Sequence, residues 1–331
     1  MRRRDLLALL GGAGAALRAT TSCAQPLQRA HRLGIIMAVG KTPEYVAAVD
    51  ALGKALALLG WRRDDNLVID ERWSSGDEAH ARSTAAEIIA SHPDVVLGQS
   101  ATVIGALSSQ TRTVPIIFVH VANPVASGFV RNLARPVGNV TGITNVVPSI
   151  GGKWLQLLKE AAPGVRRAAM LVNPDTQPDR GAMFLDPFEA AARSLGVSAK
   201  TGEVRDLEDI EAAMAGLAAE PRGGVVVIPD AFFASHSGRI VALAERFQLP
   251  AIYPYGYYVA QGGLLSYGVN NVDLFRQAAP YIDRVLRGAT PADLPVQQPT
   301  RFELVVNLKT AKALGLSLPA DFVLRADEAL E

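Results

Sequence analysis

Residues 94–121 read DVVLGQSATVIGALSSQTRTVPIIFVHV and contain a complete strand-helix-strand pattern. Two β-branched apolar runs, residues 94–98 and 115–121, flank a segment that opens with the hydroxyl residues Ser100 and Thr102, as many helices do. Strands that are apolar on both faces and alternate with helices are typical of a parallel sheet covered on both sides. This stretch therefore predicts an α/β fold.

The same alternation extends from Arg32 to the C-terminus. Further strands are expected at residues 33–39, 67–73, 168–173, 223–229, 250–253, 264–267 and 302–307. Amphipathic helices are expected at residues 44–59, 77–91, 153–162, 188–195, 207–219, 235–247 and 272–286.

The pattern is interrupted near residues 135–142, RPVGNVTG, where glycines and a proline break its rhythm. One long sheet is the alternative, but a single core rarely serves more than about 250–300 residues. We therefore predict two Rossmann-like lobes with parallel sheets, joined by three crossing segments, as in a type I periplasmic-binding-protein fold. Lobe 1 would comprise residues 31–140 and 267–298, and lobe 2 residues 143–263 and 302–331.

Residues 1–24 have the features of an export signal peptide. Three arginines precede the apolar run at residues 6–16, and the segment ends in Ser22-Cys23-Ala24. The apolar run is too short to cross roughly 30 Å of hydrocarbon, so we expect removal of the segment and a periplasmic mature protein. A twin-arginine signal and a Sec signal both remain open, as does lipid attachment at Cys23 instead of cleavage after Ala24.

Composition excludes several classes of function. The 331 residues are 49% hydrophobic and 20% charged with a formal net charge of +1, so no basic excess indicates nucleic-acid binding. Cys23 is the only cysteine, and the histidines are too scattered for the spacing of a helical zinc site. No phosphate-binding or dinucleotide-binding glycine motif and no nucleophile elbow is present. We expect a soluble monomer without cofactor, metal or catalytic residues.

Ligands of open parallel sheets bind beyond the carboxyl ends of the strands, which selects residues to inspect. Ser100 and Thr102 follow one strand, where a helix N-terminus favours an anion such as a carboxylate, although Ser100 could simply cap the helix. His120 and Asn123 follow the next strand and could hydrogen-bond a ligand. Their alternatives are a buried structural histidine and an asparagine turn before proline.

The second half of the chain supplies further candidates. Asp230 follows the strand at residues 223–229 and could meet a cationic amino group, or could cap the next helix. Tyr255 belongs to a loop of four tyrosines, of which we expect two only to pack and the others to meet a ligand. Thr141 and Tyr267, in the two glycine-flanked segments, complete the predicted ligand-binding residues.

Motifs along the whole chain resemble the substrate-binding proteins of ABC transporters, in the family that includes TrpX-like tryptophan binders. They are MRRRDLLALLGG at residues 1–12, PIIFVHVANPV at 115–125, GNVTG at 138–142, LVNP at 171–174, GGLLSYG at 262–268 and ADLPVQQPTRFELVVNLKTAKALGL at 292–316. The resemblance implies the type I fold, an amino-acid-like or other small organic ligand, and a membrane permease as partner. Relatives often carry aspartate where this chain has Asn123.

The sequence therefore predicts an exported solute-binding protein that captures a small organic ligand, amino-acid-like or a carboxylate, for an ABC importer. A ligand-sensing module of the same fold is the first alternative. An exported α/β hydrolase is the second, and only Ser100 with His120 could serve it as nucleophile and base.

Overall fold

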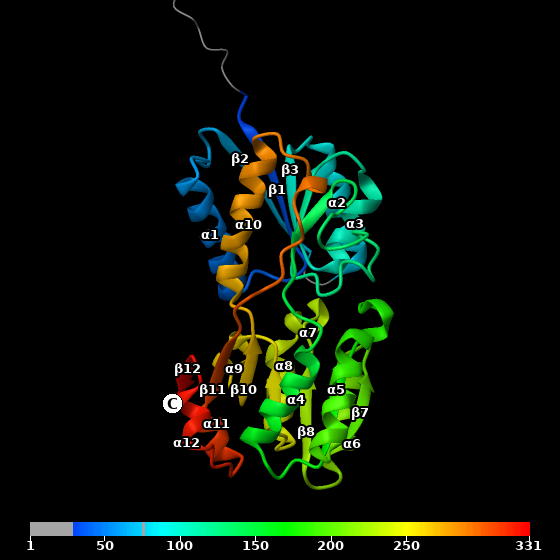
Figure 1. Ribbon diagram of the computed structural model, residues 1–331, viewed down its shortest axis with the longest axis vertical. Helices are drawn as coiled ribbons and strands as arrows, with labels where there is room; N and C mark the ends of the chain where they lie inside the picture. The colour runs from blue at the N-terminus through cyan, green and yellow to red at the C-terminus, as the bar shows by residue number, and fades with distance from the viewer. Residues whose placement is uncertain (1–28, 75–76) are drawn as a thin grey trace, which may run out of the picture.

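The computed structural model describes residues 29–74 and 77–331, which form two lobes stacked along the long axis of the molecule (Figure 1). The predicted export signal and Cys23 lie outside the described residues. Within the described ranges, no helix is both long and apolar enough to cross a membrane. Each lobe contains one sheet with helices packed on it, which confirms the predicted two-lobe α/β fold.

Lobe 1 is built on a five-stranded parallel sheet of order β2-β1-β3-β4-β5. Its first elements in chain order are β1 (His31–Met37), α1 (Pro43–Leu58), β2 (Leu67–Trp73), α2 (Glu78–Ala90), β3 (Val95–Gln99), α3 (Ala101–Gln110), β4 (Ile116–Val119) and β5 (Val140–Ile143). Helix α10 (Asn271–Leu286) and the 3-10 turn η2 (Pro291–Asp293) return from later in the chain. Helix α10 packs beside α1 and thereby completes this lobe (Figure 1).

Lobe 2 contains a seven-stranded sheet of order β12-β11-β10-β9-β8-β6-β7, in which the β10–β11 pair is antiparallel. Its strands are β6 (Arg167–Val172), β7 (Ser198–Glu203), β8 (Gly223–Val227), β9 (Ala251–Tyr253), β10 (Leu265–Gly268), β11 (Glu303–Asn307) and β12 (Glu328–Leu330). Its helices are α4 (Ile150–Ala161), η1 (Pro178–Gly181), α5 (Ala182–Leu195), α6 (Leu207–Ala218), α7 (Ala231–Ser235), α8 (Ser237–Arg246), α9 (Gly256–Ala260), α11 (Leu308–Ala313) and α12 (Ala320–Leu324).

The chain passes between the lobes after β5, between β10 and α10, and between η2 and β11, which is as many crossings as the sequence predicted. Two of the predicted lobe limits fall within strands. Residue 140 begins β5, which extends the first sheet to Ile143, and residue 267 lies in β10 of the second sheet. The first two crossings therefore begin a few residues later than predicted.

Three strands were not predicted. Strand β5 is short and lies in the segment taken as a break, whereas β7 and β12 are edge strands of the second sheet. The sequence of β7, SAKTGE, is exposed or half-buried throughout, so it lacks the apolar run that identifies a strand. Helix α5 also begins at Ala182 rather than at residue 188, and it continues through Pro187.

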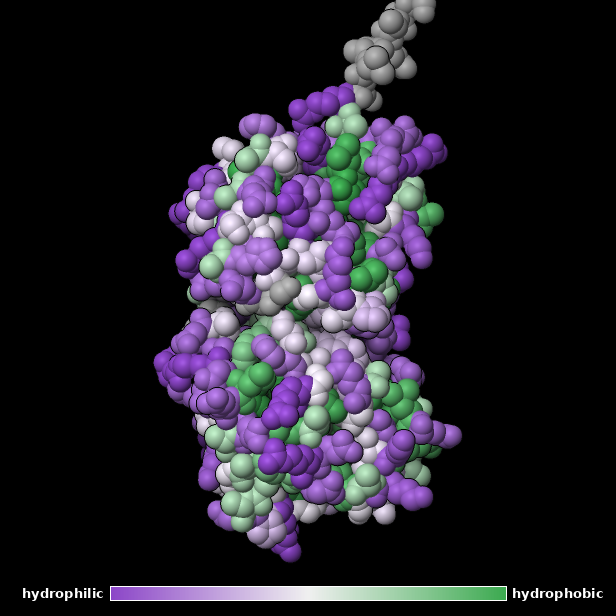
Figure 2. Space-filling model, turned by 180° about the vertical axis from the view of Figure 1, so that it is seen from behind, coloured by the Kyte–Doolittle hydropathy of each residue, from purple (hydrophilic) through white to green (hydrophobic). Residues whose placement is uncertain are grey.

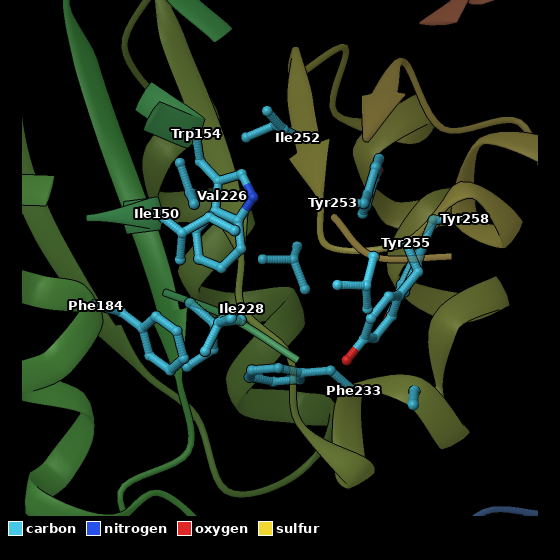
Figure 3. Close-up of a cluster of buried hydrophobic side chains, with 14 of the residues drawn as sticks. Ile150, Trp154, Phe184, Val226, Ile228, Phe233, Ile252, Tyr253, Tyr255 and Tyr258 are labelled. Carbon is cyan, nitrogen blue, oxygen red and sulfur yellow. The ribbon is translucent and has the colours of Figure 1, made fainter. Parts of the chain in front are cut away.

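The core of lobe 2 shows how tightly these elements pack (Figure 3). The rings of Trp154 on α4 and Phe184 on α5 lie 5.7 Å apart, and the Trp154 Nε1–H donates to the Tyr267 carbonyl at 2.7 Å. A Cβ atom at Gly151 would lie 2.2 Å from the carbonyl oxygen of Phe184. Glycine at this position is therefore what allows α4 and α5 to approach so closely.

The surface view from behind shows the two lobes as separate masses that meet at a narrower waist (Figure 2). Hydrophilic and hydrophobic residues are interspersed over both. The crossings run through this waist, and helix α7 of lobe 2 points toward lobe 1 there (Figure 1).

Candidate ligand-binding site

A cavity lies between the lobes, and its volume is about 530 Å³ including the part open to solvent. Lobe 1 contributes residues that follow β3 and β4, and lobe 2 contributes residues that follow β6 and β8. This is the position expected for a ligand site of parallel sheets, beyond the carboxyl ends of their strands.

Most of the predicted ligand-binding residues line this cavity, namely Ser100, Thr102, His120, Asn123, Asp230 and Tyr255. Thr141 does not, because its Oγ1–H donates to the Leu294 carbonyl at 2.6 Å within lobe 1. Tyr267 does not either, since its ring stacks on that of Phe302 with centroids 5.5 Å apart. The structure gives both residues a packing role.

Ser100 follows β3 and has a left-handed backbone, with φ of +81°. It precedes α3 but makes no side-chain capping bond, and its buried Oγ has no hydrogen-bond partner among the described residues. Capping therefore does not account for this side chain. A strained backbone and an unpaired hydroxyl at a helix N-terminus together provide donors for an anionic group.

Asp230 lies across the cavity in lobe 2, and it does cap a helix. Its Oδ1 accepts from the Phe232 N–H at 2.8 Å, while its Oδ2 accepts from Thr176 Oγ1 at 2.5 Å and Gln177 Nε2 at 2.8 Å. A carboxylate can accept about four hydrogen bonds, so it retains capacity for a ligand. Among the residues that the structure describes, no lysine or arginine lines this cavity, so the carboxylate charge favours a cationic group there.

Three aromatic rings form one wall of the cavity. The His120 centroid lies 5.5 Å from that of Tyr255 and 6.0 Å from that of Tyr45. Burial raises the pKa of Tyr255 well above its usual value, so its hydroxyl stays protonated. In the tyrosine loop, Tyr255 alone lines this cavity, because Tyr253 and Tyr257 both stack on Tyr258.

His120 follows β4 and lies with its two ring nitrogens against protein groups. Nε2 is 2.9 Å from Asn271 Oδ1, and Nδ1 is 3.4 Å from Gln99 Nε2. Burial lowers the pKa of His120 to about 4, so the ring is neutral near pH 7. Because the hydroxyl of Ser100 makes no bond to this ring, the pair has no nucleophile-base geometry.

Sequence reasoning missed several residues of the cavity, notably Tyr45, Gln99, Asn145, Thr176 and Gln177. Asn145 donates its Nδ2–H to the Tyr255 hydroxyl at 2.7 Å, and its buried Oδ1 has no partner in the described structure. Gln99 directly follows a predicted strand, and Thr176 and Gln177 follow another, so the strand-end rule could have found these three. Tyr45 and Asn145 carried no such signal.

In the described part of the chain, no three His, Cys, Asp or Glu side chains lie close enough together to hold a metal ion.

Comparison with known proteins places this geometry in context. The model of the family described as ABC transporter substrate binding protein matches residues 33–330. A protein called tyrosine-binding protein, from Clostridioides difficile strain R20291, is 26% identical over 279 residues, which are 83% of this chain and 79% of that protein.

Solved structures agree with the fold. The ABC domain in complex with L-Trp from Streptococcus pneumonia is 25% identical with a TM-score of 0.83, and the match covers 91% of this chain and all of that one. A regulator of the LacI family from Corynebacterium glutamicum is 12% identical with a TM-score of 0.56, over 83% of this chain and 97% of that one, and shows the fold alone. These likenesses confirm the predicted periplasmic-binding-protein fold.

Proposed function

Because the chain belongs to the family of ABC transporter substrate-binding proteins, we propose that it captures an aromatic α-amino acid between its lobes for an ABC importer. The family confirms the function predicted from the sequence at its coarser level, a solute-binding protein rather than an enzyme. The choice of ligand rests on the cavity.

One observation carries the proposal. The carboxylate of Asp230 in lobe 2 and the unpaired hydroxyl of Ser100 at the N-terminus of α3 in lobe 1 line the same cavity. The first suits an ammonium group and the second suits a carboxylate. The rings of Tyr45, His120 and Tyr255 then offer an aromatic wall for the side chain of the bound amino acid.

The similar proteins support this choice of ligand class. The relative from Clostridioides difficile is called a tyrosine-binding protein, and the structure from Streptococcus pneumonia is a complex with L-Trp. Both ligands are aromatic α-amino acids. They combine an ammonium group, a carboxylate and a flat aromatic ring.

The remaining parts of the function follow from the signal segment and the family. We expect a monomer, exported by a twin-arginine or Sec signal, that works in the periplasm and docks on an inner-membrane permease. A lipid anchor at Cys23 stays open, as does a ligand-sensing partner in place of the permease. We expect no interaction with nucleic acid, because the chain has no basic excess.

Calorimetry with three chemically matched ligands tests the proposal. L-tryptophan, tryptamine and indole-3-propionate share one ring, but the second lacks the carboxylate and the third lacks the ammonium group. Wild-type protein should bind L-tryptophan, or L-tyrosine in the matching tyrosine series, at least tenfold more tightly than either analogue, because charge-assisted hydrogen bonds contribute about 1.5–3 kcal/mol.

Asp230→Asn retains the oxygen that caps α7 and removes the charge. It should weaken amino-acid binding at least tenfold while hardly changing the affinity for the analogue that lacks the ammonium group. Asp206→Asn is the matched control, since Asp206 caps α6 outside the cavity in the same way. Equal affinity of wild type and Asp230→Asn for the amino acid would contradict the assigned ammonium site.

A further inference from the structure

The His120 ring of the aromatic wall belongs to a buried chain of three side chains, Gln99, His120 and Asn271. They are 3%, 8% and 2% exposed, respectively. Each comes from a different element of lobe 1, because Gln99 ends β3, His120 follows β4 and Asn271 begins α10. The backbone of His120 is left-handed with φ of +57°, a conformation that costs free energy and is common at ligand sites.

A backbone group determines the direction of the hydrogen bonds in this chain. The Ala38 N–H can only donate, and it donates to Gln99 Oε1 at 2.9 Å. The Gln99 amide nitrogen therefore faces His120 Nδ1, which must accept. His120 then carries its proton on Nε2 and donates it to Asn271 Oδ1 at 2.9 Å. Both ring nitrogens are thus used by the protein.

We propose that Gln99 and Asn271 are positioning residues for His120. They engage both nitrogens of its neutral ring, so the part of the ring that faces the cavity is apolar and selects aromatic ligands over ligands with a polar side chain. This inference rests on the proposed function, since it concerns the same site. It also differs from the expectation that His120 hydrogen-bonds the ligand. With its nitrogens engaged, the imidazole offers a ligand only its carbon edge and its face.

The chain also resists protonation of His120. A proton on Nδ1 would point at the N–H groups of Gln99, so two donors would face each other, and burial disfavours the charge as well. The groups packed against the ring are Tyr45 of α1, Tyr255 before α9 and Phe275 of α10. Both tyrosines have pKa values raised by burial, so neither supplies a negative charge. The acidic groups that act on these neighbours are Glu44, beside Tyr45, and Asp230, in the cavity.

Gln99→Glu is the decisive variant, because glutamate has nearly the same shape and can still accept from Ala38. Its second oxygen would accept from His120 Nδ1 and stabilise the imidazolium. In wild type, the NMR titration of His120, identified as the histidine signal missing from His120→Phe, should have a midpoint near the value of about 4. In Gln99→Glu the midpoint should rise by at least one pH unit.

The affinity for an aromatic amino acid should fall when the His120 ring becomes charged. In Gln99→Glu the affinity for L-tryptophan or L-tyrosine should fall at least threefold between pH 7 and pH 4.5, whereas the wild-type affinity should fall less than about twofold over that range. His120→Ala should bind the aromatic amino acid at least tenfold more weakly than wild type. His120→Phe should regain most of the wild-type affinity. Wild type and His120→Phe should both fail to bind L-histidine and L-glutamine.

Two results would overturn the inference. The first is a wild-type His120 titration near the ordinary midpoint of about 6.5. The second is a His120→Phe variant that stays folded yet binds as poorly as His120→Ala, because the ring would then hydrogen-bond the ligand. If no aromatic amino acid binds wild type, the proposed function fails, while the titrations of wild type and Gln99→Glu still decide how His120 is held.

Discussion

Asn145 donates its Nδ2–H to the hydroxyl of Tyr255 at 2.7 Å. Asn145 lies in the crossing that leaves lobe 1 after β5, and Tyr255 precedes α9 of lobe 2, so this bond joins the lobes at the cavity. Tyr45 of α1 and Tyr257 of α9 make a second contact between the lobes, with ring centroids 6.1 Å apart. Because residues that line the site also make these contacts, we predict that ligand binding and lobe closure are coupled.

Tyr255→Phe should therefore weaken both ligand binding and lobe closure. The variant removes the partner of a buried amide N–H, which costs about 1–3 kcal/mol, and that cost falls only on the arrangement in which the lobes meet. We expect about a tenfold loss in affinity by calorimetry with L-tryptophan or L-tyrosine. Tyr267→Phe is the control, because Tyr267 lies outside the cavity; equal losses in the two variants would refute the coupling.

We predict that the lobes close on a ligand by hinging at the crossings. The glycine-flanked segments near residues 139–142 and 263–268, where glycine would ease bending, lie largely in β5 and β10. A Cβ atom at Gly268 would lie 1.7 Å from the Pro254 carbonyl oxygen, so this strand end is firmly packed. Bending should fall on residues 144–149, 269–270 and 294–302. Small-angle scattering should show a smaller radius of gyration at saturating ligand, and an unchanged radius would exclude a hinged clamp.

Substitutions at Ser100 should separate binding from stability. Ser100→Ala removes a hydroxyl that has no partner among the described residues, so unfolding stability should hardly change while affinity falls about tenfold. Ser100→Gly should stabilise the fold by about 1 kcal/mol, because glycine tolerates the left-handed backbone, and should lose the same affinity. A Ser100→Ala variant that loses stability but binds normally would mean that the hydroxyl is structural.

Thr141→Val and Tyr267→Phe should leave ligand affinity unchanged. Neither residue lines the cavity, because Thr141 bonds the Leu294 carbonyl and Tyr267 stacks on Phe302. Thr141→Val should destabilise lobe 1 by about 1–3 kcal/mol, since a buried carbonyl loses its donor. Urea unfolding measures the stability and calorimetry measures the affinity of the same preparations. An affinity loss beyond threefold in either variant would show that its residue contributes to the binding site.

Asp230→Ala should cost both affinity and stability. Asp230 caps α7 and accepts hydrogen bonds from Thr176 and Gln177 in the protein without ligand. Loss of a helix cap alone costs about 0.5–2 kcal/mol. The melting temperature should therefore fall further in Asp230→Ala than in Asp230→Asn, which keeps the cap but replaces the oxygen that accepts from Gln177 by a donor, while both lose affinity for the amino acid. Identical melting temperatures of Asp230→Ala and wild type would refute the capping role.

Stability should decline on acidification through His120. Its pKa is lowered from 6.5 to about 4 in the folded protein, so the unfolded chain binds the proton more strongly. The neutral ring's contribution is complete above pH 6.5 and is lost as the pH falls toward 4, to a total of about 3 kcal/mol. The free energy of unfolding of wild type relative to that of His120→Phe, measured with urea, should decrease as the pH falls through this window. His80→Gln tests whether removal of any histidine has that effect, and a constant wild-type advantage would contradict the shift.

The secondary structure was predictable wherever a buried element also has a recognisable hydrophobic pattern in its sequence. Strands such as β3 and β4 are fully buried, so their apolar runs stand out in the sequence. Strand β7 is an edge strand with a polar sequence, and β5 lies between a glycine turn and a crossing, so neither has a periodic signal. Their strand conformation depends on hydrogen bonds to neighbours that are distant in the chain, such as β6 and β4.

By itself, the sequence determined the two-lobe α/β class, the family resemblance and six side chains of the cavity, because strand ends can be located from hydrophobic pattern and ligands gather there. Only the tertiary structure decided what those side chains do. The unpaired hydroxyl of Ser100, the engaged nitrogens of His120 and the bond from Asn145 to Tyr255 arise from groups far apart in the chain. Burial and hydrogen-bond partners are properties of the folded arrangement, so residue type and spacing could not reveal them.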